Sequence, residues 1–186
     1  MIQTTDTLKS QKSDSKILKN LFKGNFSDSY SVTEFDSTYT IIGDCLDVLS
    51  HMKDHSVNIG ITSPPYNLDK NYGKYNDDKP LEEWEALIEN VAKQMHRVLK
   101  PNGTLILELP DILENCKQFE QADFQKRYEL LNVIYGGVTP EYPHRWGWWD
   151  EELISHLLHA GFSSAKRGEL VFVGHWGYNM RIEAIK

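Results

Sequence analysis

An apolar run that ends abruptly in two prolines constrains this sequence more than any other stretch. Residues Val57 to Ile61 are rich in β-branched side chains, which is typical of a buried strand. The residues that follow, Thr62-Ser-Pro-Pro-Tyr66, cannot continue a hydrogen-bonded ladder because proline has no N–H group. The sequence therefore predicts that the chain leaves a sheet at Ser63, and ligands of α/β proteins sit at such carboxyl ends.

The two prolines also make the loop after this strand stiff, because each ring fixes its own φ angle. A stiff loop can hold the main-chain carbonyls of Ser63 and Pro64 as a preset pair of acceptors beside the ring of Tyr66. This arrangement suits a planar ring that carries an amino group. The ring would stack on Tyr66, and its amino group would donate to the Ser63 side chain and the Pro64 carbonyl. The alternative is an ordinary proline turn with a packed tyrosine.

The motif Ser63-Pro-Pro-Tyr66 resembles the catalytic motif of the DNA amino-methyltransferases, and its serine form resembles the N4-cytosine enzymes of that family. The resemblance extends from Ile41 to about Leu109. Three further segments resemble the opening of the β group of the family in their order and spacing, namely Gly43–Leu49, Ser56–Leu68 and Val98–Leu105. Several ordered motifs together are more specific than one tetrapeptide.

This resemblance implies a fold and an activity. The fold would be an α/β, Rossmann-like class I methyltransferase sandwich of three layers, incomplete in this chain, with a mostly parallel sheet and an antiparallel C-terminal edge. The activity would be methylation of an exocyclic amino group of a nucleobase in DNA, N4 of cytosine first and N6 of adenine next. S-adenosyl-L-methionine (AdoMet) would be the methyl donor.

The resemblance also assigns roles to residues. Ser63 and the Pro64 carbonyl would accept hydrogen bonds from the amino group, Pro65 would stiffen the loop, and Tyr66 would stack the base after it flips out of the duplex. Asp44 and Cys45 would lie against the adenosine end of AdoMet, with Ser63 also near the cofactor. The predicted contacts to the substrate come from Tyr66, Asn67, Tyr72 and Trp146.

Each of these assignments has a plainer alternative. Asp44 directly precedes a short helix, so its side chain could simply cap that helix. The polar segment 69–79 around Tyr72 could be a solvated loop. The tryptophans near Trp146 could pack in the core or in a subunit interface instead of stacking a ring.

Two features of the family are not found in this sequence. No Gly-x-Gly occurs anywhere in it, so the glycine-rich AdoMet loop is missing, and little room remains for a target-recognition region. We therefore expect a second subunit or a homo-oligomer to complete the AdoMet site. The alternatives are a class I N-methyltransferase for another substrate, such as a small molecule, and an inactive methyltransferase-like subunit or AdoMet-binding protein.

Length and charge narrow the expectations further. A chain of 186 residues fits one domain, here a polar N-terminal extension over residues 1–38 and a methyltransferase-like domain over residues 39–186. The net charge of −7 gives no overall basic surface, whereas proteins that grip duplex DNA usually have one. A local basic patch or a partner would have to compensate.

Cysteine content and hydropathy exclude other classes of protein. The two cysteines, Cys45 and Cys116, fit a reducing compartment and favour neither a disulfide framework nor a zinc cluster, and we expect no metal site. No apolar run approaches 20 residues, so we expect no membrane span and a cytoplasmic location.

The apolar periodicity also predicts the order of secondary structure. The expected helices cover residues 15–22, 45–52, 80–99, 110–132 and 150–160, the last with Asp150 as its N-cap and Gly161 as its stop. The expected strands cover residues 39–43, 57–61, 104–109, 169–174 and 180–185. The expected loops include residues 27–32 and the long irregular segment 133–149.

Overall fold

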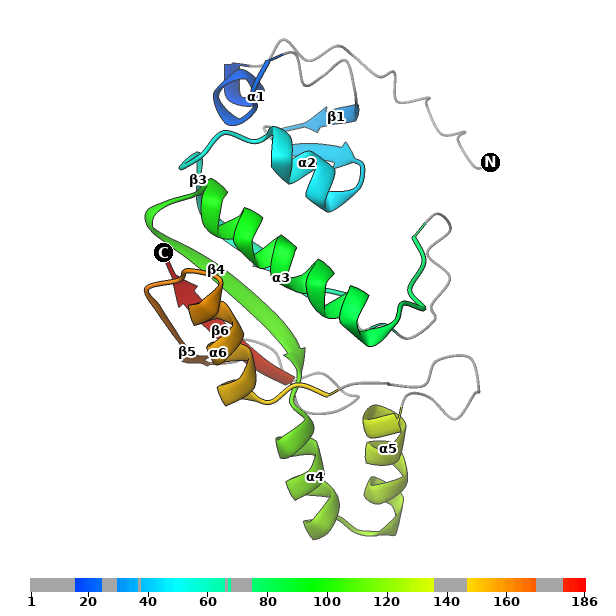
Figure 1. Cartoon of the computed structure of the whole chain (residues 1–186). Helices are drawn as coiled ribbons and strands as arrows, with labels where there is room; N and C mark the ends of the chain where they lie inside the picture. The colour runs from blue at the N-terminus through cyan, green and yellow to red at the C-terminus, as the bar shows by residue number, and fades with distance from the viewer. Residues whose placement is uncertain are drawn as a thin grey trace, which may run out of the picture.

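The computed structural model describes residues 16–24, 30–36, 38–65, 67, 75–135, 147–169 and 179–186, with the backbone alone for residues 132, 133 and 135. Six helices and six strands lie in these ranges (Figure 1). The helices are α1 Lys16–Leu21, α2 Cys45–His51, α3 Leu81–Val98, α4 Ile112–Gln121, α5 Phe124–Tyr135 and α6 Asp150–His159. The strands are β1 Ser31–Phe35, β2 Thr38–Ile42, β3 Val57–Thr62, β4 Leu99–Pro110, β5 Ser164–Gly168 and β6 Asn179–Ile185.

The main sheet has the strand order β3-β4-β6-β5. Strands β3 and β4 are parallel, and β6 is antiparallel to both of its neighbours. Three of the four strands therefore run in the same direction, as expected for a mostly parallel α/β sheet. The antiparallel C-terminal edge is confirmed, because the last two strands, β5 and β6, pair antiparallel at that end of the sheet.

The prediction of a strand over residues 169–174 is wrong at its start. The chain enters β5 at Ser164, soon after the turn at Gly161, and Glu169 already lies outside the strand. Residues 170–174 lie outside the described residues. Strand β5 has the sequence Ser-Ala-Lys-Arg-Gly, whose single apolar residue, Ala165, gives no run that apolar periodicity could detect. It forms a strand because pairing with β6 satisfies its backbone.

Helix α3 forms the crossover between the parallel strands β3 and β4, as the sequence predicted. Its first turn carries Glu82 and Glu83, which suit the positive end of the helix dipole. Its apolar stripe packs closely on the sheet, since a Cβ atom at Gly60 would lie only 2.5 Å from Cε of Met95. Helix α6 lies on the same side of the sheet as α3 (Figure 1).

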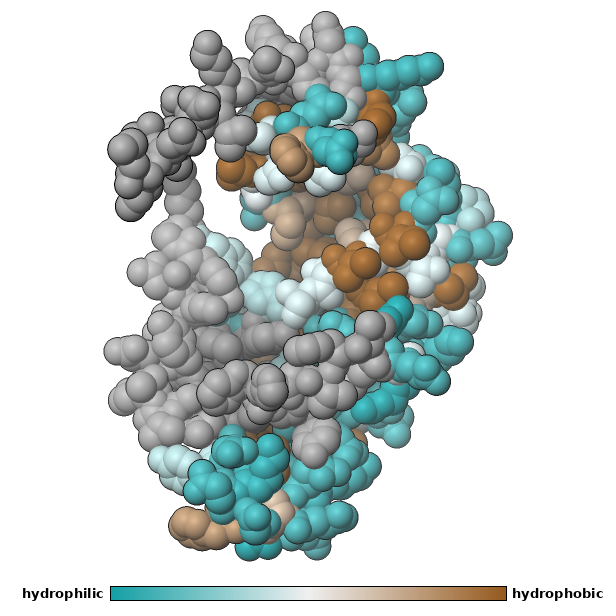
Figure 2. Space-filling view, turned by 180° about the vertical axis from the view of Figure 1, so that it is seen from behind, coloured by the Kyte–Doolittle hydropathy of each residue, from teal (hydrophilic) through white to brown (hydrophobic). Residues whose placement is uncertain are grey.

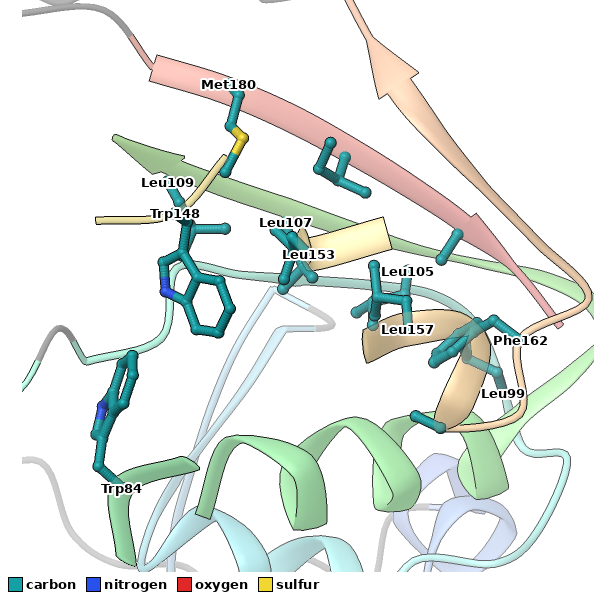
Figure 3. Packing of buried hydrophobic residues seen from close by; sticks show 13 residues of the cluster. Trp84, Leu99, Leu105, Leu107, Leu109, Trp148, Leu153, Leu157, Phe162 and Met180 are labelled. Atoms are coloured by element: carbon teal, nitrogen blue, oxygen red, sulfur yellow. The ribbon is translucent and has the colours of Figure 1, made fainter. Parts of the chain in front are cut away.

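These two helices enclose the main core with one face of the sheet (Figure 3). The core is built mainly from leucines of β4, alternate residues of β6 and one side of α6. Its buried members are Trp84, Leu99, Leu105, Leu107, Leu109, Trp148, Leu153, Leu157, Ala160, Phe162, Met180, Ile182 and Ala184.

The opposite face of the sheet is exposed to solvent at β3. Ile59 and Ile61 point to that face, and their side chains are 57% and 73% exposed. Within the described ranges, both helices that pack on the sheet, α3 and α6, lie on the other face. The described chain therefore shows two of the three layers expected for the sandwich.

A second, two-stranded sheet is formed by β1 and β2 and packs with α1 and α2. The predicted helix over residues 15–22 is confirmed by α1, whose Leu18 is buried. The loop prediction is wrong for Ser31 and Val32, which begin β1. Pairing with β2 buries Val32 in this second core, and one apolar residue among polar neighbours gave no such signal.

The single helix predicted over residues 110–132 is in fact a hairpin of two helices, α4 and α5 (Figure 1). The chain breaks at Ala122 and Asp123, where the Asp123 carboxylate accepts a hydrogen bond from the Lys126 amide at 2.8 Å. The Arg127 guanidinium donates to the carbonyls of Phe119 and Glu120 at the end of α4. These contacts satisfy helix-end groups that a continuous helix would not expose.

A buried carboxylate ties the end of β4 to two neighbouring elements. The Asp111 side chain is 3% exposed; it accepts a hydrogen bond from the Glu114 amide as the N-cap of α4 and forms an ion pair with Arg167 of β5 at 2.5 Å. Arg167 also contacts Asp150 at 3.4 Å. Helix α6 begins at Asp150 and its N-cap is Trp149. The prediction of Asp150 as the N-cap is therefore wrong by one residue.

We expect Arg167→Met to lower the free energy of unfolding by about 1–3 kcal/mol, because it leaves the buried Asp111 carboxylate without its counter-charge. Chemical denaturation monitored by circular dichroism measures the change. The double variant Asp111→Asn/Arg167→Met removes that uncompensated charge and should recover part of the loss. Equal stability of wild type and Arg167→Met would contradict this role for the ion pair.

Candidate functional site

The carboxyl ends of β2 and β3 open onto one cavity of about 790 Å³. Strand β2 ends before Gly43 and Asp44, and β3 ends before Ser63, so both turns reach the cavity wall. Ligand pockets commonly fall in the range of about 300–1,000 Å³. The remaining wall is mostly apolar and comes largely from one side of α3, including Leu87, Ile88, Val91 and Met95.

The Ser63-Pro-Pro65 turn is the stiff element predicted from the sequence. It follows directly on Thr62, the last residue of β3, and all three of its residues line the cavity. The Pro64 carbonyl accepts no hydrogen bond from the part of the chain that the structure describes. No described residue therefore competes with a ligand for this carbonyl.

The Pro65 carbonyl, in contrast, accepts a hydrogen bond from the core side. Trp84, in the first turn of α3, is 1% exposed and donates from its indole Nε1 to this carbonyl at 3.0 Å. The Trp84 ring lies 5.6 Å from that of Trp148, which in turn meets His156 of α6 edge-on at 5.7 Å. Figure 3 shows the two tryptophans facing each other between α3 and the sheet. The Trp84 hydrogen bond thus anchors the Ser63-Pro-Pro65 turn to the main core.

Asn67 closes the other side of the turn. Its φ angle is +58° and its side chain is buried. The amide Nδ2 donates to the Lys79 carbonyl at 2.8 Å, and the Lys79 N–H donates to Oδ1 at 2.8 Å. The predicted substrate contact of Asn67 stays a prediction, but both ends of its side chain serve to join the turn to the start of α3.

The structure confirms that Asp44 caps α2, and the predicted contact of Asp44 to AdoMet stays a prediction. Its Oδ1 accepts hydrogen bonds from the amides of Leu46 and Asp47 at 3.0 and 3.1 Å, so Asp44 is the N-cap of α2. It also lines the cavity, and both hydrogen bonds of the cap go to Oδ1. The same carboxylate can therefore cap the helix and accept a hydrogen bond from a ligand.

Cys45 lies beside Asp44 in the cavity wall. Partial desolvation of the thiol and the nearby Asp44 carboxylate raise its pKa. A raised pKa keeps the thiol protonated at neutral pH, and the thiolate is the nucleophilic form of cysteine. Cys45 therefore suits a contact to a ligand rather than covalent catalysis.

The structure also reveals a residue that sequence reasoning placed in a loop. The ring of Tyr30 lies over the turn after β2, where a Cβ atom on Gly43 would come within 2.9 Å of it. The Tyr30 hydroxyl donates to Asp47, and this hydrogen bond raises the pKa of Tyr30 to about 12. A glycine at the end of a strand signals such a close approach, but the sequence does not reveal which side chain approaches.

Three predicted site residues, Tyr66, Tyr72 and Trp146, lie outside the described residues, and their roles stay predictions. Trp148, from the same tryptophan-rich segment, packs in the core, as the packing alternative expected. Among the residues with described side chains, no group of His, Cys, Asp or Glu is arranged to hold a metal ion. In these same ranges no helix has the length and apolar character that a membrane crossing requires.

Comparison with known proteins agrees with the motif. Residues 57–146 match the family model described as DNA methylase. The chain is 40% identical over 67 residues to the type II methyltransferase M.BglII of Bacillus subtilis, and 32% identical over 102 residues to M.BglI of the same organism. The resemblance to the DNA amino-methyltransferases is confirmed.

These matches to DNA methylases cover only part of each protein. The M.BglII match involves 36% of this chain and 18% of the relative, and the M.BglI match involves 50% and 28%. The chain thus spans less than a third of these relatives. Among solved structures, a protein described as a possible exported protein from Bordetella parapertussis shares the fold, with a TM-score of 0.50 and 11% identity over 77% of this chain and 42% of that chain.

The conformation of the Ser63-Pro-Pro65 turn should depend on the two hydrogen bonds of the Asn67 side chain. Asn67→Ala removes both hydrogen bonds to Lys79 and places a Cβ-bearing residue without a polar side chain at a positive φ, so it should cost about 2–3 kcal/mol of unfolding free energy. Asn67→Gly loses the same hydrogen bonds but tolerates the φ angle. Chemical denaturation should therefore rank wild type above Gly and Gly above Ala; equal stability of the two variants would contradict the strained φ.

Trp84→Phe tests the hydrogen bond behind the motif while keeping an aromatic ring in the core. We expect a loss of about 1 kcal/mol from the missing donor and somewhat more from the smaller ring. Hydrogen exchange measured by mass spectrometry should show faster exchange in residues 62–67. Unchanged exchange there would show that the indole N–H does not hold the turn.

Proposed function

We propose that this chain carries the base-binding and catalytic motif of an AdoMet-dependent methyltransferase that acts on an exocyclic amino group in DNA. The preferred target is N4 of cytosine, followed by N6 of adenine. The single observation that carries the proposal is the shared cavity at the ends of β2 and β3, which both Asp44 and Pro64 line and where no described residue donates to the Pro64 carbonyl. The partial matches to DNA methylases support it.

The cavity fits the adenosine part of AdoMet by its chemistry. Asp44 supplies a carboxylate acceptor for hydroxyl or amino donors, and the apolar residues Val48, Leu49 and Ile41 supply a wall for a flat ring. When bound, AdoMet supplies a methyl group on a positively charged sulfur as the electrophile. Among the described residues, no glycine-rich turn offers N–H groups for its methionine carboxylate, so we propose that a second subunit or another copy completes the site.

The motif residues orient the reacting nitrogen. The Ser63 side chain and the Pro64 carbonyl accept hydrogen bonds from the two N–H groups of the target amino group, which directs the nitrogen lone pair into the cavity. Pro65, fixed by Trp84, prevents the acceptors from moving. Tyr66 stacks the flipped base, because a base inside a duplex cannot reach such a pocket. The rate enhancement then comes mainly from positioning.

The Asp44 assignment can be tested with a matched pair of variants. Asp44→Asn keeps a good N-cap for α2 but lacks the full negative charge, whereas Asp44→Ala loses both. Isothermal titration calorimetry with AdoMet should show wild-type binding and about tenfold weaker binding by Asp44→Asn, which corresponds to about 1.4 kcal/mol. Unchanged affinity in Asp44→Asn, with its helix content preserved, would remove Asp44 from the site.

The target atom can be read from the product. DNA incubated with the protein and AdoMet, digested to nucleosides and analysed by mass spectrometry, should contain N4-methylcytosine. Ser63→Ala and Tyr66→Ala should each lower the yield about a hundredfold while the protein stays folded, because each removes a group that positions the base. N6-methyladenine would correct the target. Absence of both AdoMet binding and product would favour the inactive-subunit hypothesis.

A further inference from the structure

A second cavity, the α3–α6 slot, lies between helices α3 and α6 and the sheet. Its volume is about 60 Å³, roughly four to six times the space that one water molecule requires. Figure 2 shows the molecule from the other side, where apolar side chains gather in a hollow. The slot and the first cavity are neighbours because they share lining residues, namely Thr62, Pro64, Ile88, Val91 and Met95.

The inner wall of the slot is apolar. Strand β4 contributes Leu105, Leu107 and Leu109, and α6 contributes Leu153 and Leu157. Figure 3 shows these leucines between the sheet and α3. Their side chains offer no hydrogen bonds, and an apolar cavity of this kind holds apolar groups in preference to water. The slot therefore suits the hydrocarbon part of a ligand.

Carboxylates stand at the mouth of the slot. Glu85 and Glu89 of α3 line it and are exposed, and Glu89 forms an ion pair with Lys93 at 2.5 Å. Glu152 of α6 lies near Glu85. Burial raises the pKa of Glu152 and the charge of Glu85 adds to this increase, whereas His156 opposes it. The mouth thus favours a positively charged group.

One oxygen atom of Glu152 is left without a hydrogen bond. Its Oε2 is buried, and no described residue donates to it. A buried carboxylate oxygen without a donor costs free energy, and native structures usually supply one from protein or water. An ammonium group carries three donors and a positive charge. An ammonium group at the mouth would therefore satisfy Glu152 and balance the charge of Glu85.

We propose that the α3–α6 slot binds a small aliphatic amine, with its hydrocarbon chain among the leucines and its ammonium group between Glu85 and Glu152. The volume admits only a short chain. Because Pro64 lines the slot as well as the first cavity, the bound chain contacts the Ser63-Pro-Pro65 turn. This site is separate from the proposed methylation and does not depend on it.

The direction of entry favours a free amine over a lysine of another protein. The apolar wall is buried and the carboxylates are at the exposed end, so the ligand enters with its chain first. A lysine side chain has the reverse order, because its ammonium group is at the free end. It would carry its charge to the leucines and leave its apolar part at the carboxylates.

The test titrates the full chain with butylammonium, 1-butanol and butyrate, which each have four carbon atoms and differ in the charge of the head group. NMR of ¹³C-labelled methyl groups follows Ile88, Val91 and Met95 in the slot, with the exposed Leu113 as reference. We expect butylammonium to shift the slot signals and to bind about tenfold more tightly than 1-butanol, because its hydrogen bonds are charge-assisted. Butyrate should not bind.

Two variants separate the charge from the cavity. Glu152→Gln keeps the size of the side chain but removes its charge, so it should lower the affinity for butylammonium to that for 1-butanol. Glu151→Gln changes the neighbouring exposed carboxylate; it is the matched control and should alter neither affinity. Ala92→Leu places a larger side chain in the slot and should abolish binding of both probes. Circular dichroism verifies that each variant is folded, and Ala92→Val replaces Ala92→Leu if the latter is not.

Several results would overturn the proposal. They are unmoved slot signals at saturating butylammonium, equal affinity for 1-butanol or butyrate, and wild-type affinity in Glu152→Gln. Binding of Nα-acetyl-lysine methylamide as tight as that of butylammonium would instead assign the slot to a lysine side chain of a partner protein. None of these readouts uses AdoMet, so the result stands apart from the test of the methyltransferase site.

Discussion

The site depends on one constraint, the fixation of a proline turn between the sheet and the start of α3. Trp84 holds the Pro65 carbonyl from the core side, and the Asn67 side chain joins the turn to Lys79 just before α3 begins. Two prolines remove most of the remaining freedom. Neither contact uses the Pro64 carbonyl, and no described residue donates a hydrogen bond to it. Preset acceptors of this kind lower the reorganisation needed to bind and orient an amino group.

The same arrangement links packing to chemistry. Trp84 belongs to the core cluster that α3 and α6 form with β4 and β6, so the position of the motif follows from the burial of large apolar side chains. On the other side of the cavity, Tyr30 and the cap made by Asp44 fix the turn after β2. The two walls come from different sheets, and the exposed Ile61 lines the hollow between them. Each turn at the mouth of the cavity is thus tied to its own core.

The parts that could be predicted from the sequence are those with strong local signals. The apolar run into Ser63-Pro-Pro marked the end of β3, and the stripe from Trp84 to Val98 marked α3. Strand β5 was missed because Ser164–Gly168 is polar and becomes a strand only through pairing with β6. The hairpin of α4 and α5 was missed because Arg127 and Asp123 satisfy the helix ends through contacts that periodicity does not reveal. The contact of Tyr30 with Gly43 and that of Trp84 with Pro65 join segments distant in sequence, so no local pattern predicts either one.

Hydrogen exchange of the chain with and without AdoMet is the most direct measurement of the central claim, that the cavity at the ends of β2 and β3 binds the cofactor. The account predicts slower exchange in the amides of residues 44–48 and 61–63, with no change in α4 and α5. Protection confined to other elements, or no protection at saturating AdoMet, would contradict it.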